Sequence, residues 1–212
     1  MKHKKIKKRL WLVVAIIVII ILGVGFYFVQ QNKSPKTDKL NIQTEQSLAN
    51  QENKQLAEQN HLYSGDDFTM LPPSGWLRSQ LPGTLVSYQN PVEKHPTGSA
   101  AEKINFRTYL AVSFDNSNGQ TLAEIIELVK RQIQSIAPAA VLQSTTPGII
   151  DNEPATFMEF NLTMQNIDFK VMMIIVLKGD KYFTISNNTT IEKWPEYQET
   201  FYNTAGSFKF KY

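Results

Sequence analysis

The start of this chain limits what the rest of its 212 residues can do, because it has the pattern of a membrane-spanning helix. Twenty uncharged, mostly apolar residues, 10–29, follow a short tail with six basic residues: Lys2, Lys4, Lys5, Lys7, Lys8 and Arg9. As an α-helix rising about 1.5 Å per residue, such a run crosses about 30 Å of hydrocarbon. Aromatic residues lie near both ends of the run, where their rings favour the membrane interfaces. The sequence therefore predicts one transmembrane helix over residues 10–29.

The basic tail sets the orientation of this helix. Lys and Arg beside a span are retained on the cytoplasmic side, so residues 1–9 are expected inside the cell and everything after residue 29 outside. A cleaved signal peptide is the alternative, but its apolar region is shorter, about 7–15 residues, and ends at a small-residue cleavage site. Here more aromatic and apolar residues follow Gly23-Val24-Gly25. We interpret the run as an uncleaved, single-pass plasma-membrane anchor that contacts lipid.

Composition restricts the functions open to the part outside the membrane. Without the six basic residues of the tail, 16 Lys and Arg stand against 19 Asp and Glu, a net charge of −3. A mildly acidic surface argues against nucleic acid as a ligand, because phosphate binding needs concentrated positive charge. The chain has no cysteine, which excludes disulfides, thiolate nucleophiles and cysteine metal sites.

The extracytoplasmic part divides into a linker and a domain. Residues 30–61 are rich in Gln, Asn, Lys and Glu and poor in large apolar residues, so they cannot bury enough surface to offset the entropy of ordering. We interpret them as a flexible polar linker. Residues 62–212 have strand and helix patterns throughout and are predicted to form one domain.

Several strands are predicted in this domain from alternating apolar and polar residues. They cover residues 68–71, 84–88, 104–114, 141–145, 158–164, 167–177, 182–186 and 207–212, with turns expected at Pro147-Gly148, Gln165-Asn166 and Gly179-Asp180. Residues 171–177 are apolar at every position, which predicts a central strand covered on both faces.

Two helices are predicted. Thr121 and Glu124 form a capping box before apolar residues at helical spacing, Pro138 ends that helix, and Glu127 is expected to pair with Arg131. The second is expected over 190–205, with Pro195 in its first turn. The predicted fold is α+β: a mostly antiparallel sheet of about six or seven strands with helices on both faces, an α/β/α sandwich.

Four stretches of this domain carry a family resemblance: FTMLPPSGW, the helix TLAEIIELVKRQI, the paired MEFNLTM and FKVMMIIVL, and the closing WPEYQETFYNTAGSFKF. Their apolar and aromatic spacing resembles the PsbP-like family, named after an extrinsic lumenal protein of photosystem II. The resemblance implies an antiparallel sheet flanked by helices and a role in binding other proteins without catalysis. The span and linker depart from the photosynthetic members, so the photosystem role is not carried over. No functional residue of the family transfers.

No catalytic, cofactor-binding or metal site is predicted. His61 and His95 are interpreted as exposed loop residues, because neither has partners at the spacing of a zinc site. Asp66-Asp67 lacks the rest of a calcium loop, and residues 115–119 (DNSNG) lack its downstream carboxylate, so a turn is favoured over calcium there. Ser74, beside Gly75, is interpreted as a turn residue. Two further sets of residues are weaker candidates: the scattered acids Glu153, Glu159 and Asp168, and the aromatics Trp76, Trp194, Tyr197 and Phe201, which are assigned to the core.

The favoured function is a non-catalytic, membrane-anchored domain that binds or scaffolds an unidentified envelope protein. One alternative is an extracytoplasmic small-molecule sensor, and another is an envelope enzyme with an unrecognised site, which would require a cleft with perturbed titratable groups. A pilin-like subunit is disfavoured, since no processing site precedes the apolar run.

Overall fold

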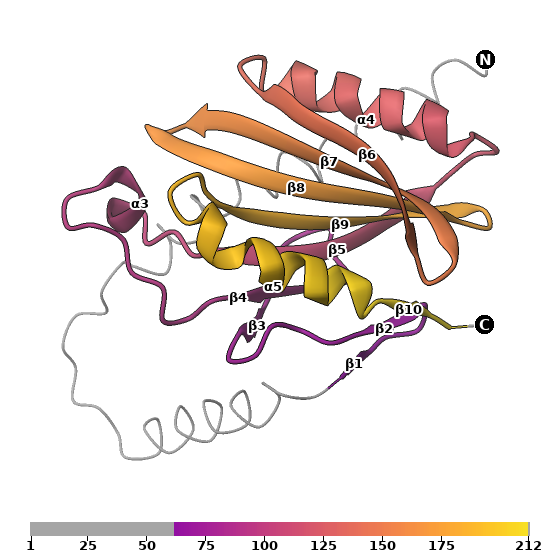
Figure 1. Ribbon diagram of the computed structural model, residues 1–212, viewed down its shortest axis with the longest axis horizontal. Coiled ribbons are helices and arrows are strands. Elements are labelled where there is room, and N and C mark those ends of the chain that lie inside the picture. Colours follow the sequence, from indigo (N-terminus) through magenta and orange to yellow (C-terminus); the bar gives the residue numbers. More distant parts are fainter. Residues whose placement is uncertain (1–61, 212) are drawn as a thin grey trace.

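The computed structural model describes residues 62–211, which form two antiparallel sheets and three helices (Figure 1). The predicted tail, transmembrane helix and linker, residues 1–61, lie outside the described residues. Within residues 62–211, no helix is long and apolar enough to cross a membrane.

Seven strands form the larger sheet, and every neighbouring pair is antiparallel. Its spatial order is β3-β4-β5-β9-β8-β7-β6, so the four last strands of the sheet follow one another as hairpins along the chain. Their bounds are β3 Leu77–Ser79, β4 Val86–Gln89, β5 Tyr109–Asn116, β6 Val141–Ile150, β7 Glu153–Met164, β8 Ile167–Lys178 and β9 Lys181–Thr190. The predicted antiparallel sheet is confirmed.

The strand β8 is buried on both faces, as its sequence predicts. Met172, Ile174 and Val176 belong to one core cluster, and Val171, Met173 and Ile175 belong to another on the opposite face. All six are buried, because successive side chains of a strand point to opposite sides of the sheet. A strand of this kind needs a covering layer on each face, and the helices supply it.

The two long helices lie on opposite faces of the sheet (Figure 1). The helix α4, Leu122–Ile136, packs on β7 and β8, and the predicted capping box is present: Glu124 N–H donates to Thr121 Oγ1, while Thr121 N–H donates to Glu124 Oε2. The helix α5, Trp194–Gly206, packs on β9 from the other side. A short helix, α3, spans Ala100–Lys103.

A smaller sheet closes one end of the α5 face. It consists of β1 (Tyr63–Ser64), β2 (Phe68–Met70) and β10 (Lys209–Phe210), in the order β1-β2-β10. Phe68 anchors it to the core: the side chain is 1% exposed and its ring stacks on Phe208 at 4.3 Å. The first and last parts of the domain are thus joined beside α5, which positions the candidate site.

Four local predictions are wrong. Pro147-Gly148 is not a turn, because β6 continues to Ile150 and the hairpin turns at Asp151 and Asn152, both with positive φ. A proline is tolerated there because β6 is an edge strand. The strand expected from residue 104 begins only at Tyr109, after α3. The second helix starts at Trp194, since residues up to Thr190 belong to β9. Glu127 pairs with Lys130, at 2.9 Å, and not with Arg131.

Candidate functional site

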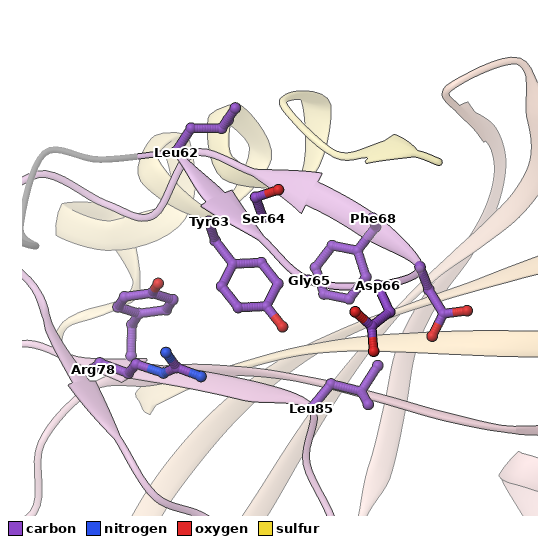
Figure 2. A pocket seen from close by; sticks show the side chains of 10 residues that line it. Leu62, Tyr63, Ser64, Gly65, Asp66, Phe68, Arg78 and Leu85 are labelled. Atoms are coloured by element: carbon purple, nitrogen blue, oxygen red, sulfur yellow. The ribbon is translucent and has the colours of Figure 1, made fainter. Parts of the chain in front are cut away.

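A half-open pocket of about 480 Å³ lies between the smaller sheet and the end strands of the larger one (Figure 2). Its walls come from β1, the turn before β2, and strands β3 and β4. The lining residues are Leu62, Tyr63, Ser64, Gly65, Asp66, Asp67, Phe68, Arg78, Leu85 and Tyr88. This volume lies within the range of about 300–1,000 Å³ that is usual for small-ligand pockets.

The short turn between β1 and β2 shapes one wall of the pocket. The Gly65 N–H donates to the Phe68 carbonyl at 3.0 Å, which closes the turn. Gly65 also makes room for Tyr63, because a Cβ added at position 65 would lie 2.5 Å from the phenol oxygen. The Tyr63 ring is therefore held over the turn and against Phe68, with ring centroids 5.1 Å apart. The phenol thus occupies space beside position 65 that a larger residue would fill.

Arg78 faces this wall from β3. Its guanidinium carbon lies 5.7 Å from the centre of the Tyr63 ring, within the range of a cation–π contact. Figure 2 shows the guanidinium beneath the Tyr63 ring and the Asp66 carboxylate beside the phenol oxygen. Burial raises the pKa of the Tyr63 hydroxyl, Arg78 lowers that pKa, and the negative charges of Asp66 and Asp67 raise it further. The phenol is therefore a neutral hydrogen-bonding group between charges of both signs.

The charges of the pocket differ in whether another residue neutralises them. Asp67 Oδ1 is 2.7 Å from Lys181 Nζ, so its charge is balanced within the protein. Lys211 Nζ donates to Ser64 Oγ at 2.8 Å. Arg78 and Asp66, by contrast, form no ion pair within residues 62–211. The pocket thus presents one unneutralised positive group and one unneutralised negative group on opposite walls.

The sequence did not single out Tyr63 or Arg78. Arg78 stands beside Leu77 in a three-residue strand, and only the tertiary structure brings it to the turn of residues 65–67. Asp66 and Asp67, which lack the rest of a calcium loop, line the pocket and contribute negative charge to it. Among residues 62–211, no histidine lines the pocket.

A second polar cluster is buried at the loop that follows β4, and here a sequence interpretation is wrong. His95 is not an exposed loop residue: its side chain is 2% exposed, and Nε2 lies 3.0 Å from the Phe106 carbonyl oxygen and 3.8 Å from Glu93 Oε1. Glu93 accepts hydrogen bonds from the Thr108 N–H and from Thr108 Oγ1, the latter at 2.8 Å. The Glu93-x-His95 spacing was a signal that could have indicated this pair.

These contacts give the Glu93 cluster a structural role. Thr108 Oγ1 lies 2.7 Å from Thr189 Oγ1 on β9, and Asn90 Nδ2 donates to the Tyr197 hydroxyl of α5 at 2.7 Å. Burial raises the pKa of the Tyr197 hydroxyl well above its ordinary value, and the negative charge of Glu93 acts in the same direction. The cluster joins the loop after β4 to the sheet and to α5, and all its principal groups have partners.

The other residues considered from the sequence are not brought together. Glu153 and Glu159 each pair with a lysine at 2.6 Å, and Asp168 accepts from the Thr163 hydroxyl. The aromatic residues Trp76, Trp194, Tyr197 and Phe201 pack in the core on the α5 face, as predicted. The ring centroids of Trp76 and Phe201 are 6.2 Å apart. Ser74 lies in a turn beside Gly75, whose φ is +77°.

Residues 115–119 end a strand and form a turn, in which Asn118 and Gly119 have positive φ. In the described part of the chain, no three His, Cys, Asp or Glu side chains come together in a way that would hold a metal ion. His61 lies outside that part.

An exposed edge strand, β6, is the remaining surface feature. Val141, Leu142 and Ile149 are 56%, 40% and 71% exposed, and the strand carries no charge. Two devices protect this edge from pairing with another chain: Pro147, which has no N–H to donate, and an irregularity in the register between Leu142 and Ser144. The exposed edge of β6 is therefore poorly suited to pair with a strand of another chain.

Comparisons with known proteins agree with this fold. The solution structure of cyanobacterial PsbP (CyanoP) from Synechocystis sp. PCC 6803 matches with a TM-score of 0.55 and 18% identity, over 71% of this chain and 92% of that one. LpqN, described as involved in cell envelope biogenesis of Mycobacterium tuberculosis, matches with a TM-score of 0.53 and 8% identity, over 72% of this chain and 83% of that one. At these identities the likeness concerns the fold alone.

A comparison with curated proteins finds no match. A family model described as PsbP covers residues 58–210, which includes all the strands and helices described above. The chain therefore belongs to the PsbP family.

Proposed function

We propose that this protein is a non-catalytic binding domain, held at the outer side of the plasma membrane by residues 10–29, and that it binds another envelope protein through the pocket between its two sheets. The orientation follows from the basic tail, and the linker of residues 30–61 provides reach from the membrane. LpqN, a protein of the same fold, is described as involved in cell envelope biogenesis.

The observation that carries this proposal is the unneutralised pair of charges in the pocket. Arg78 and Asp66 lie at the protein surface on opposite walls, and the partly exposed Leu62 and Leu85 stand beside them. A pocket with apolar sides and a few convergent polar groups is typical of a recognition site. An anchor inserted there from a partner would be fixed in orientation by the two charges.

The proposal is tested by site-specific photo-crosslinking in intact cells that make the full chain. A photoreactive amino acid replaces Leu85 in the pocket, and in a matched control it replaces Ala123 on the exposed side of α4. One discrete crosslinked protein is expected from position 85 and not from 123, and Arg78→Met should abolish it. The proposal is wrong if position 85 yields no product, or if both positions yield the same products irrespective of Arg78.

A further inference from the structure

The pocket also indicates the chemistry of the group that enters it. The walls carry three charged side chains. Asp67 is balanced by Lys181 at 2.7 Å, and the exposed Arg78 and Asp66 have no ion-pair partner within residues 62–211. A ligand with a single charge would leave the other protein charge unpaired. A ligand that carries both charges close together would satisfy both.

Geometry places the two charges on opposite sides of one polar group. The Tyr63 ring lies against Arg78 on one side, and its phenol oxygen points toward Asp66 (Figure 2). All three charged residues influence the Tyr63 hydroxyl, so they lie within electrostatic reach of it. Because the hydroxyl stays neutral and lies on the Asp66 side, its oxygen can accept a hydrogen bond from an ammonium group held by Asp66.

We infer that this pocket binds a zwitterion, with the carboxylate of the ligand at Arg78, its ammonium group at Asp66, and its apolar side chain against Leu62 and Leu85. A free amino acid or a short peptide with both ends unblocked has this chemistry. The end of a partner protein supplies it only when the terminal charge lies beside an oppositely charged side chain. The inference rests on the proposed function, since it names what the pocket recognises.

Arginine suits the carboxylate side of such a site, because its planar fork can donate two parallel hydrogen bonds. On β3, Arg78 is supported by pairing with Tyr88 of β4, so the guanidinium starts from a fixed strand position. Asp66 occupies a turn whose backbone is closed by the Gly65–Phe68 hydrogen bond. Both charged groups therefore project from ordered backbone.

The test uses the full chain in detergent micelles and the dipeptide Ala-Ala as the probe in isothermal titration calorimetry. We expect a Kd of the order of 1 mM for a ligand of this size. Acetylation of the amino end or amidation of the carboxyl end should each weaken binding about tenfold, because each removes a charge-assisted contact. Free alanine is titrated in parallel. It should bind with a similar Kd if the two charges of a single amino acid are sufficient for recognition.

Variants separate the two ends of the ligand. Arg78→Met should remove the preference for a free over an amidated carboxyl end and keep the preference for a free amino end. Asp66→Asn should do the reverse. Arg131→Met, an equal charge change on the exposed side of α4, should change neither. A loss of folding would weaken binding to every form of the dipeptide equally, so the selective loss identifies the site.

The inference is overturned if neither Ala-Ala nor free alanine binds at a ligand concentration of about 10 mM, tenfold above the expected Kd. It is also overturned if the variants leave the preferences for free amino and carboxyl ends unchanged. The proposed function is judged separately. A crosslinked partner from position 85 that Ala-Ala does not displace would overturn the zwitterion and leave the binding domain in place. Displacement of that partner by Ala-Ala would support the inference and show that the partner protein supplies the same chemistry.

Discussion

Lys181 Nζ lies 2.7 Å from Asp67 Oδ1, although the two residues are 114 positions apart in the sequence. The contact joins the turn before β2 to the beginning of β9, and so joins the smaller sheet to the larger one. It also decides the electrostatics of the pocket, because it neutralises Asp67 and leaves the adjacent Asp66 without a partner among the described residues. Two neighbouring aspartates thus have different roles.

Replacing Asp67 by Asn should lower the free energy of unfolding only slightly. The two side chains of the pair are 30% and 31% exposed, and ion pairs near the surface contribute about 0–1 kcal/mol. Urea unfolding of the full chain in micelles, followed by tryptophan fluorescence, measures the change. A double-mutant cycle with Lys181→Met isolates the pair, and a coupling above about 2 kcal/mol would contradict this account.

Glu93→Ala should destabilise the protein much more, by about 3 kcal/mol, because it leaves the buried Thr108 N–H without its acceptor and removes one of the two partners of the Thr108 hydroxyl. The carboxylate itself is fully buried. The same urea experiment measures the effect, and Glu192→Ala, at an exposed position, is the control with an expected change within about 0.5 kcal/mol. Equal stabilities of the two variants would show that the Glu93 cluster does not hold the loop after β4.

Gly148→Ala should destabilise β6 through a clash with an aromatic ring. A Cβ at position 148 would lie 2.5 Å from Cε2 of Phe157, whose ring stacks on Tyr202 at 6.0 Å. Displacing the ring should cost about 1–3 kcal/mol, the usual range for overpacking. Gly206→Ala is the matched control, since nothing lies within 4 Å of its added Cβ, and alanine at this exposed end of α5 should be neutral or stabilising. Thermal melting of the two variants compares them directly.

Asp151 should make stability depend on pH. Burial acts to raise the pKa of this carboxyl, but hydrogen bonds from Lys209 Nζ and the Phe210 N–H, together with the charges of Lys209 and Lys178, outweigh burial and lower it. Because the folded-state pKa lies below the unfolded one, the stabilisation is present at neutral pH. It is lost as the pH falls from about 4 through the folded-state value.

Urea unfolding of the wild type and of Asp151→Asn between pH 7 and 2.5 tests this dependence. The wild type should be the more stable at neutral pH, and the difference should shrink in the acid range. Lys209→Met should reduce the pH-dependent part, because it removes a hydrogen-bond donor and a positive charge from the carboxylate. A difference that stays constant across the whole range would contradict the assigned contacts.

Local patterns were sufficient for much of the fold. The capping box at Thr121 and Glu124 involves residues three apart, and the hairpin turns at 165–166 and 179–180 are set by neighbouring residues, so the sequence predicted them. The unbroken apolar run of β8 predicted burial on both faces, because alternate side chains must point to opposite sides of a strand. Errors arose where tertiary context overrides local signals, as at Pro147, which an edge strand accepts, and at residues up to Thr190, which pair in β9 before α5 begins.

The sequence by itself predicted an anchor and a linker, which lie outside the described residues, and it determined an antiparallel sheet flanked by helices, because such features depend on composition and on periodicity within single segments. The tertiary structure alone decided the pocket and the buried Glu93 cluster. Arg78 meets Tyr63 only because the smaller sheet packs beside β3, and Thr108 meets Thr189 only because β5 lies beside β9. Such contacts join distant segments, and no local spacing of residues encodes them.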